Sequence, residues 1–197
     1  FYDTFNNAPY MAAFVTPADP PIMKFSDTAN RVLAGGIGAT GSDEDAVKVL
    51  AAIWQALVNV GVTYKHEPTA YWTGRHAQYI KYPRDVLKDK AGTCIDLALL
   101  FASLAEAQGL RTAIVLVPGH AFPVVYLPSG SMVAVETTMV ADRATFQEAL
   151  RGGAEQLQGL RETPYIVVDV EDMQARGVLP PELPRLPEDA LKRWGIT

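Results

Sequence analysis

Apolar residues recur at helical spacing over residues 43–60, and this pattern predicts the first well-defined helix of the chain. Ser42 stands at its N-cap position, and acidic residues fill the first turn, where the helix dipole favours negative charge. Gly61 ends the pattern, as glycine commonly does after a helix. We expect this helix to bury the face that carries Val47, Leu50, Trp54, Leu57 and Val58.

A second helix is predicted from about Cys94 to Gln108, and Gly109 stops it. Its only charged residues are Asp96 and Glu106, and leucine and phenylalanine cover most of its circumference. A helix that is apolar nearly all round is buried on all sides. This helix is therefore expected at the centre of the molecule.

Beyond Gly109 the hydrophobic pattern changes to the short apolar runs that are typical of β-strands. Pro118-Gly119 and Pro128-Ser129-Gly130 separate the first three runs, and the second of these turns predicts a hairpin. Because helices come first and an antiparallel meander follows, the predicted fold class is α+β. The predicted strands cover residues 112–117, 121–127, 132–137 and 165–170, and a further helix is predicted over 143–150.

The two ends of the chain lack this regular pattern. Residues 1–41 are interpreted as an extended N-terminal arm with one short helix at about 25–34, and residues 42–178 as the core. Residues 179–197 are rich in proline and predict an extended wrap that ends in a short helix near Leu191. We expect one domain overall, cut or processed from a longer protein, because the chain starts with Phe1.

Composition narrows the function classes. The 197 residues are 49% hydrophobic and carry a formal net charge of −5, so the chain can form a core, and nucleic acid is an unfavourable partner. No run of apolar residues is long enough to span a membrane. The single cysteine excludes an internal disulfide and a cysteine-rich zinc site. His66 and His76 lack the spacing of metal ligands, so we expect no metal site. We also expect that the protein has no cofactor and is a monomer.

Cys94 is the first candidate for chemistry, because it falls at the start of the predicted buried helix. Thr93 is a plausible N-cap, and Asp96 three residues later completes a capping box. The helix dipole at this position favours the reactive thiolate. Asp96 is expected to cap the helix and to face away from the thiol, because positions i and i+2 point about 200° apart. A lone cysteine is more often a small buried apolar residue, so Cys94 alone decides nothing.

His120 and Glu136 complete the candidate site. His120 opens a predicted strand, and Glu136 lies in the next one, where an apolar neighbourhood makes an unpaired carboxylate costly. The hairpin places Glu136 about opposite Phe122, which makes it a diagonal neighbour of His120. Taken singly, a buried core histidine and a solvated glutamate at a strand end are the ordinary explanations. The combination indicates a nucleophile, a base and an orienting carboxylate.

From about Gln78 to Val140 the chain resembles the transglutaminase-like superfamily, bacterial members of unsettled role in particular, which are relatives of the papain-like cysteine peptidases. The resemblance is carried by 92–98 (GTCIDLA), 109–110 (GL), 119–122 (GHAF) and 136–138 (ETT). It implies a papain-like core, with the cysteine helix on an antiparallel sheet, and the roles of nucleophile, general base and orienting carboxylate for Cys94, His120 and Glu136. Glu136 replaces the usual aspartate of the family, and Phe122 the usual tryptophan.

Further site residues are expected before Cys94. In the papain-like relatives an upstream glutamine side chain stabilises the oxyanion, and here Gln78 is the candidate, with the Trp72 indole as a reserve. Trp72, Tyr79 and Tyr82 are candidates for lining a substrate cleft, although aromatic residues more often pack in a core. A surface amide is an equally good explanation of Gln78.

The expected function is cysteine-dependent acyl transfer on the carbonyl of a protein, peptide or amide substrate. Hydrolysis is favoured over cross-linking, because water needs no acceptor site of its own. The alternative is a silent module of the same fold that binds a peptide or a cell-envelope polymer, since fold does not imply activity. A reactive Cys94 thiol would distinguish the two.

Overall fold

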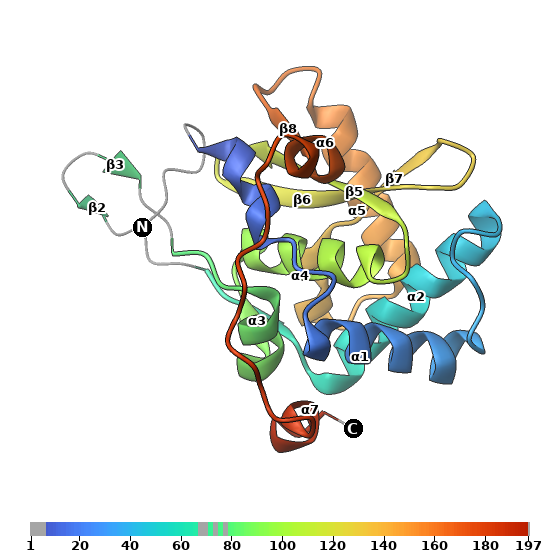
Figure 1. Cartoon of the computed structure of the whole chain (residues 1–197). Helices are drawn as coiled ribbons and strands as arrows, with labels where there is room; N and C mark the ends of the chain where they lie inside the picture. The colour runs from blue at the N-terminus through green and yellow to red at the C-terminus, as the bar shows by residue number, and fades with distance from the viewer. Residues whose placement is uncertain (1–6, 67–70, 73–74, 77–78, 197) are drawn as a thin grey trace.

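The computed structural model describes residues 7–66, 71–72, 75–76 and 79–196 (Figure 1). The helical elements are η1 (Ala8–Phe14), α1 (Pro20–Ala29), η2 (Asn30–Ala34), α2 (Asp43–Val60), α3 (Pro83–Asp89), α4 (Cys94–Glu106), η3 (Thr137–Asp142), α5 (Phe146–Gly159), α6 (Val170–Ala175) and α7 (Ala190–Arg193). The strands are β1 (Thr63–Tyr64), β2 (Tyr71–Trp72), β3 (Arg75–His76), β4 (Ala91–Gly92), β5 (Arg111–Val117), β6 (His120–Tyr126), β7 (Met132–Ala134) and β8 (Ile166–Asp169). No helix in the described ranges is long and apolar enough to cross a membrane.

The main sheet has four strands in the order β7-β6-β5-β8, and every neighbouring pair is antiparallel. The predicted α+β class is therefore confirmed. Val124 pairs with Ala134, so the register of the predicted hairpin continues to Phe122 opposite Glu136, as expected. The ladder itself ends at Ala134, which makes β7 three residues shorter than predicted, because Glu136 already caps the following helix η3.

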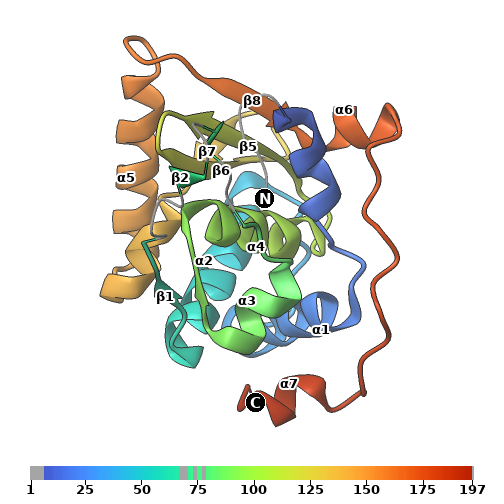
Figure 2. The same ribbon diagram turned by 90° about the vertical axis from the view of Figure 1, so that its left-hand side faces the viewer.

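Helix α4 lies at the centre of the molecule, as its apolar circumference predicted. Every residue from Ile95 to Ala105 is buried. One side of the helix packs with α1 and α2, and the other side packs against β5 and β6 (Figure 2). Burial on both sides leaves the ends of α4 as the places where its residues meet polar groups.

Helix α2 also follows its prediction. The Ser42 side chain accepts a hydrogen bond from the backbone N–H of Asp45, and Gly61 closes the helix with a φ of 78°. The two capping signals in the sequence were sufficient to place both ends. The buried face includes Leu50, Trp54 and Leu57, whose apolar area drives the packing on α4.

The N-terminal segment is not the extended arm that the sequence suggested. Residues 8–14 form the 3₁₀ helix η1, and α1 begins at Pro20 rather than near residue 25. Met11, Ala12 and Val15 are fully buried against the sheet side of α4. Tertiary burial of these apolar side chains outweighs the turn and proline signals that dominate the local sequence.

Helix α5 is longer than predicted, and α6 was missed. The predicted end near residue 150 is wrong, because Gly152 and Gly153 lie inside α5 rather than after it. Both glycines permit a close approach that larger residues would prevent. A Cβ at Gly153 would lie 2.7 Å from the backbone nitrogen of Val135 and closer still to the carbonyl group of Ala134.

This contact yields a prediction for stability. Gly153→Ala should lower the free energy of unfolding by roughly 3 kcal/mol, because the new methyl meets backbone atoms that cannot move aside. Gly159→Ala is the matched control on the same helix, since nothing lies within 4 Å of its Cβ position. Chemical denaturation of both variants measures the difference, and equal stability of the two would contradict the close packing.

Candidate active site

Cys94 is the first residue of α4, and a capping box holds this end of the helix. The Asp96 carboxylate accepts the backbone N–H of Thr93 at 3.0 Å, and the Thr93 hydroxyl accepts the N–H of Asp96 at 3.5 Å. Asp96 also accepts the backbone N–H of Lys81 at 2.8 Å. The expected role of Asp96 as a cap is confirmed, and the residue in addition fastens the chain before α3 to the start of α4.

Burial raises the pKa of Asp96, and the hydrogen bonds from Thr93 and Lys81 oppose that rise. The carboxylate is only 2% exposed, so these backbone donors replace the water that it has lost. Cys94 itself is free and half-buried, at the edge of the apolar cluster that lines the sheet side of α4. Hydrogen bonds therefore fix this end of α4, and Cys94 lies at its partly exposed edge.

His120 opens β6 directly after the turn at Gly119, whose φ is 78°. Its Nε2 lies 2.7 Å from Oε2 of Glu136, and its side chain is 21% exposed. The expected pairing of these two residues is present. Because Nε2 is engaged with the carboxylate, Nδ1 is the nitrogen left for the thiol of Cys94.

The charge balance of the site follows from these contacts. A hydrogen bond with Cys94, and next one with Glu136, raise the pKa of His120 to about 9, although burial acts in the opposite direction. Burial pushes the pKa of Glu136 upward, but hydrogen bonds from His120 and Thr138 outweigh it and leave this pKa below its ordinary value. The arrangement thus favours an imidazolium beside the Glu136 carboxylate at neutral pH.

Glu136 is only 6% exposed, and both of its carboxylate oxygens accept hydrogen bonds from neighbouring residues. Thr138 donates to Oε1 through its backbone N–H at 3.2 Å and its hydroxyl at 2.5 Å. Gln156 of α5 donates from Nε2 to Oε2 at 3.2 Å, so it shares that oxygen with His120. The backbone N–H of Glu136 donates to the carbonyl of Ala149 at 3.0 Å.

Two residues of this neighbourhood escaped the sequence reasoning. Tyr64 pairs with Gly92 across β1 and β4, and burial first, then the charges of Cys94 and Glu136, raise its pKa. No local pattern predicts a parallel pairing across 27 intervening residues. Gln156 was missed because the predicted helix ended before it.

The remaining predicted residues have different outcomes. Gln78 lies outside the described residues, and Trp72 belongs to β2 but its side chain is not described. Tyr79 is 62% exposed, whereas Tyr82 caps α3 and stacks on Phe14 with ring centroids 5.0 Å apart. His66 is exposed, as expected. Tyr82 thus packs against η1.

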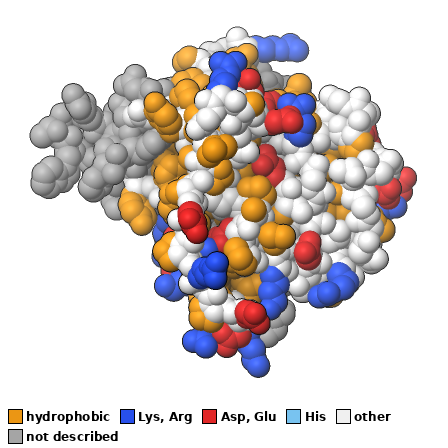
Figure 3. Space-filling model, viewed as in Figure 1, with side chains coloured by type: hydrophobic (Ala, Val, Ile, Leu, Met, Phe, Trp, Pro, Cys, Tyr) orange, Lys and Arg blue, Asp and Glu red, His pale blue; other side chains and the backbone are white. Residues whose placement is uncertain are grey.

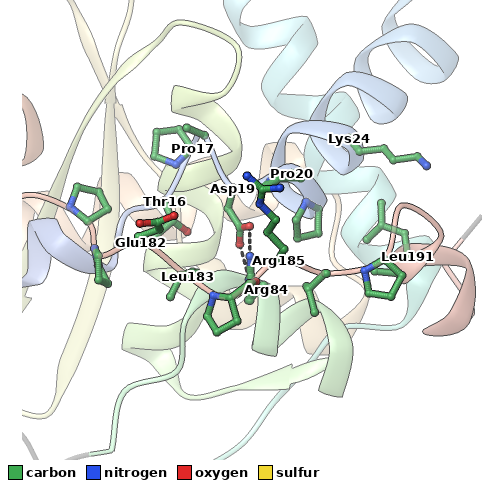
Figure 4. A pocket seen from close by; sticks show the side chains of 18 of the residues that line it. Thr16, Pro17, Asp19, Pro20, Lys24, Arg84, Glu182, Leu183, Arg185 and Leu191 are labelled. Carbon is green, nitrogen blue, oxygen red and sulfur yellow. Dashed lines mark hydrogen bonds and ion pairs between the residues drawn. The ribbon is translucent and has the colours of Figure 1, made fainter.

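A separate groove of about 1120 Å³ lies elsewhere on the molecule, between the segment 179–188 and the turn before α1. Arg84 there forms a buried ion pair with Asp19 and donates from Nη1 to the carbonyl of Pro184 at 2.7 Å (Figure 4). Hydrophobic side chains gather along the middle of this face, with charged groups among them (Figure 3). Cys94, His120 and Glu136 do not line the groove, so it is not part of the candidate site.

No protein-family model matches the chain, and no curated protein matches it. Within the described ranges, no group of three or more histidine, cysteine, aspartate or glutamate residues is placed to hold a metal ion. The site offers three groups of its own for chemistry, a thiol, an imidazole and a buried carboxylate, which form a row with the imidazole of His120 in the middle.

The row predicts how His120 responds to loss of the carboxylate. Glu136→Gln should weaken proton binding by His120 roughly tenfold or more, because the amide keeps the shape and loses the negative charge. The pKa of His120, which its neighbours raise to about 9 in the parent protein, would then be lower. A ring-nitrogen NMR titration measures this, and an unchanged midpoint would show that Glu136 does not act on His120.

The capping box predicts a structural role for Asp96. Asp96→Ala should lower the free energy of unfolding by roughly 1–3 kcal/mol, because the buried backbone N–H of Thr93 and the partly buried N–H of Lys81 lose their acceptor. Glu148→Ala removes the equivalent residue from the capping box of α5, where the side chain faces solvent, and should cost less. Thiol labelling of folded Asp96→Ala should stay near that of the parent; its loss despite native stability would assign Asp96 to the chemistry.

Proposed function

We propose that the chain is a cysteine-dependent acyl-transfer enzyme that acts on a peptide or amide carbonyl. The observation that carries the proposal is the position of His120, whose Nε2 lies 2.7 Å from Oε2 of Glu136 and whose pKa is raised first by Cys94 and then by Glu136. A nucleophile, a base and an orienting carboxylate in one row form the minimal apparatus for covalent catalysis by a thiol.

The order of the elements supports a relation to the transglutaminase-like and papain-like proteins. The cysteine opens a buried helix, the histidine opens a strand packed on that helix, and the carboxylate follows the neighbouring antiparallel strand. We infer a papain-like core on this ground. Glu136, in place of the family's usual aspartate, reaches His120 at 2.7 Å.

In the first half of the reaction the sulfur of Cys94 attacks the carbonyl carbon, and the carbonyl π electrons move to oxygen. The backbone N–H of Cys94 at the start of α4 is a suitable donor to that oxyanion. His120 holds the thiol proton and gives it to the leaving amine as the C–N bond breaks. The products are a free amine and an acyl thioester on Cys94.

In the second half His120 takes a proton from the acceptor while the acceptor attacks the thioester carbonyl. The C–S bond breaks, the thiol of Cys94 is restored, and the acyl group leaves on the acceptor. We favour water as the acceptor, which gives a carboxylic acid, because hydrolysis needs no further binding site. Glu136 keeps His120 oriented through both proton transfers and stabilises its positive charge.

Labelling of Cys94 tests this function without knowledge of the substrate. Iodoacetamide should alkylate the parent protein rapidly near neutral pH, and His120→Ala should slow alkylation on the order of 100-fold, because the partner of the thiol is lost. His66→Ala is the matched control, since His66 is an exposed histidine outside the row. Mass spectrometry after timed quenching gives the rates.

Slow alkylation of Cys94 in the parent protein, at a rate that His120→Ala does not change, would contradict the proposal. A module that binds a peptide or a cell-envelope polymer without turnover would then be the better description. If the thiol is reactive, peptide amides incubated with a labelled primary amine separate the acceptors by product mass. Acid products without amine adducts indicate hydrolysis, and adducts indicate cross-linking.

A further inference from the structure

The carboxylate of Glu136 receives more donors than the orientation of His120 requires. His120 and the Gln156 carboxamide both bind Oε2, at 2.7 and 3.2 Å, while Thr138 supplies both donors to Oε1. Gln156 therefore acts on the same atom that His120 uses. A second hydrogen bond to one carboxylate oxygen reduces the negative charge that this oxygen offers to the first donor.

The packing of α5 brings Gln156 to this position. The adjacent Gly152 and Gly153 lie three and four residues after Ala149 and four and three residues before Gln156, so these residues share one face of the helix. Ala149 accepts the backbone N–H of Glu136. A Cβ at Gly152 would lie 2.9 Å from the Cβ of Glu136, so only glycine lets the helix come this near.

The two glycines approach different parts of the segment that carries Glu136. Gly153 faces the backbone of Ala134 and Val135 at the end of β7, and Gly152 faces Glu136 itself. The half-buried Gln156 side chain, one turn further along, then spans the remaining gap to the carboxylate. Helix α5 is thus seated against the segment that carries Glu136 and presents a neutral amide to its carboxylate.

We propose that Gln156 is a positioning residue that regulates the site: its carboxamide holds the Glu136 carboxylate toward His120 and limits how strongly that carboxylate retains the imidazole proton. A general base must release its proton as well as accept it, and an imidazolium held too firmly is a poor acid. The consequence for turnover rests on the proposed function, whereas the effect on His120 does not.

Other titratable groups act on the same pair and have to be separated from Gln156. Cys94 at the start of α4 raises the pKa of His120, and Tyr64 of β1 lies within the electrostatic reach of Cys94 and Glu136. Cys94 contributes to the raised pKa of His120, so its effect has to be removed before the effect of Gln156 is measured. Measurements in a Cys94→Ala background remove this effect and leave the Glu136 contacts in place.

The test is an NMR titration of the His120 ring in that background. The chain has only three histidines, so His66→Gln and His76→Gln assign the signals. Gln156→Met removes the donor at nearly constant shape and should raise the proton affinity of His120 about threefold, because Oε2 recovers negative charge. Gln156→Lys places a cation beside Glu136 and should lower the affinity about threefold or more.

Gln158→Lys is the matched control, because it makes the same change of charge on an exposed position of α5. It should leave the His120 midpoint close to that of the background protein. Opposite shifts for the Met and Lys variants at position 156, with no comparable shift at 158, support the proposal. An unchanged midpoint in both variants at 156, or an equal shift at 158, overturns it.

The same measurements keep this inference apart from the proposed function. If the shifts occur but the Cys94 thiol of the parent chain is inert, Gln156 acts on His120 and the acyl-transfer proposal fails. If the thiol is reactive and His120 titrates identically in all variants, the acyl-transfer proposal stands and the role of Gln156 fails. Thermal unfolding of each variant verifies that the titrations report on folded protein.

Discussion

The burial of helix α4 is the constraint on which the rest of the structure depends. A helix with eleven consecutive buried residues, Ile95 to Ala105, must be covered on every side. The antiparallel sheet covers one side, α1 and α2 cover the other, and the N-terminal segment completes the enclosure. Such a helix offers polar chemistry only at its ends, and Cys94 occupies the end where backbone N–H groups and the dipole favour negative charge.

A second buried feature, the carboxylate of Glu136, organises the other half of the site. An anion that is 6% exposed persists only if donors replace its lost hydration, and here His120, Thr138 and Gln156 supply them. This requirement accounts for the early end of β7, the cap of η3 and the close seating of α5. The paired glycines of α5 belong to the same solution, because they let the helix reach the carboxylate.

Away from the site, a buried ion pair and a hydrogen bond join segments near the two ends of the chain. Arg84 of α3 binds Asp19 before α1 and the carbonyl of Pro184 in the C-terminal segment. One side chain therefore ties segments from both ends of the chain to α3. Lys81 lies just before α3, and its backbone N–H binds Asp96 at the start of α4. The short segment 81–84 therefore contacts both terminal segments and the helix that carries Cys94.

The sequence by itself determined the elements whose signals are local. Helix α2 and the start of α4 follow from N-caps and apolar spacing, and the β5-β6-β7 meander follows from its turn residues. The predicted hairpin register already made Glu136 a neighbour of His120, because the pairing of two strands determines which of their residues lie side by side. The pairing of His120 with Glu136 could be predicted for that reason, and Cys94 was a candidate because it starts the predicted buried helix.

Only the tertiary structure decided the rest. The residues of η1 look extended in sequence and become a 3₁₀ helix because Met11, Ala12 and Val15 are buried on α4. The parallel pairing that brings Tyr64 beside the site joins segments far apart in the chain. Gly152 and Gly153 look like a helix end, yet they lie inside α5, where Gly152 packs against the Glu136 side chain and Gly153 against the backbone of Ala134 and Val135. Non-local contacts of this kind leave no periodic trace in the sequence, so no local pattern could have revealed Gln156 as a partner of Glu136.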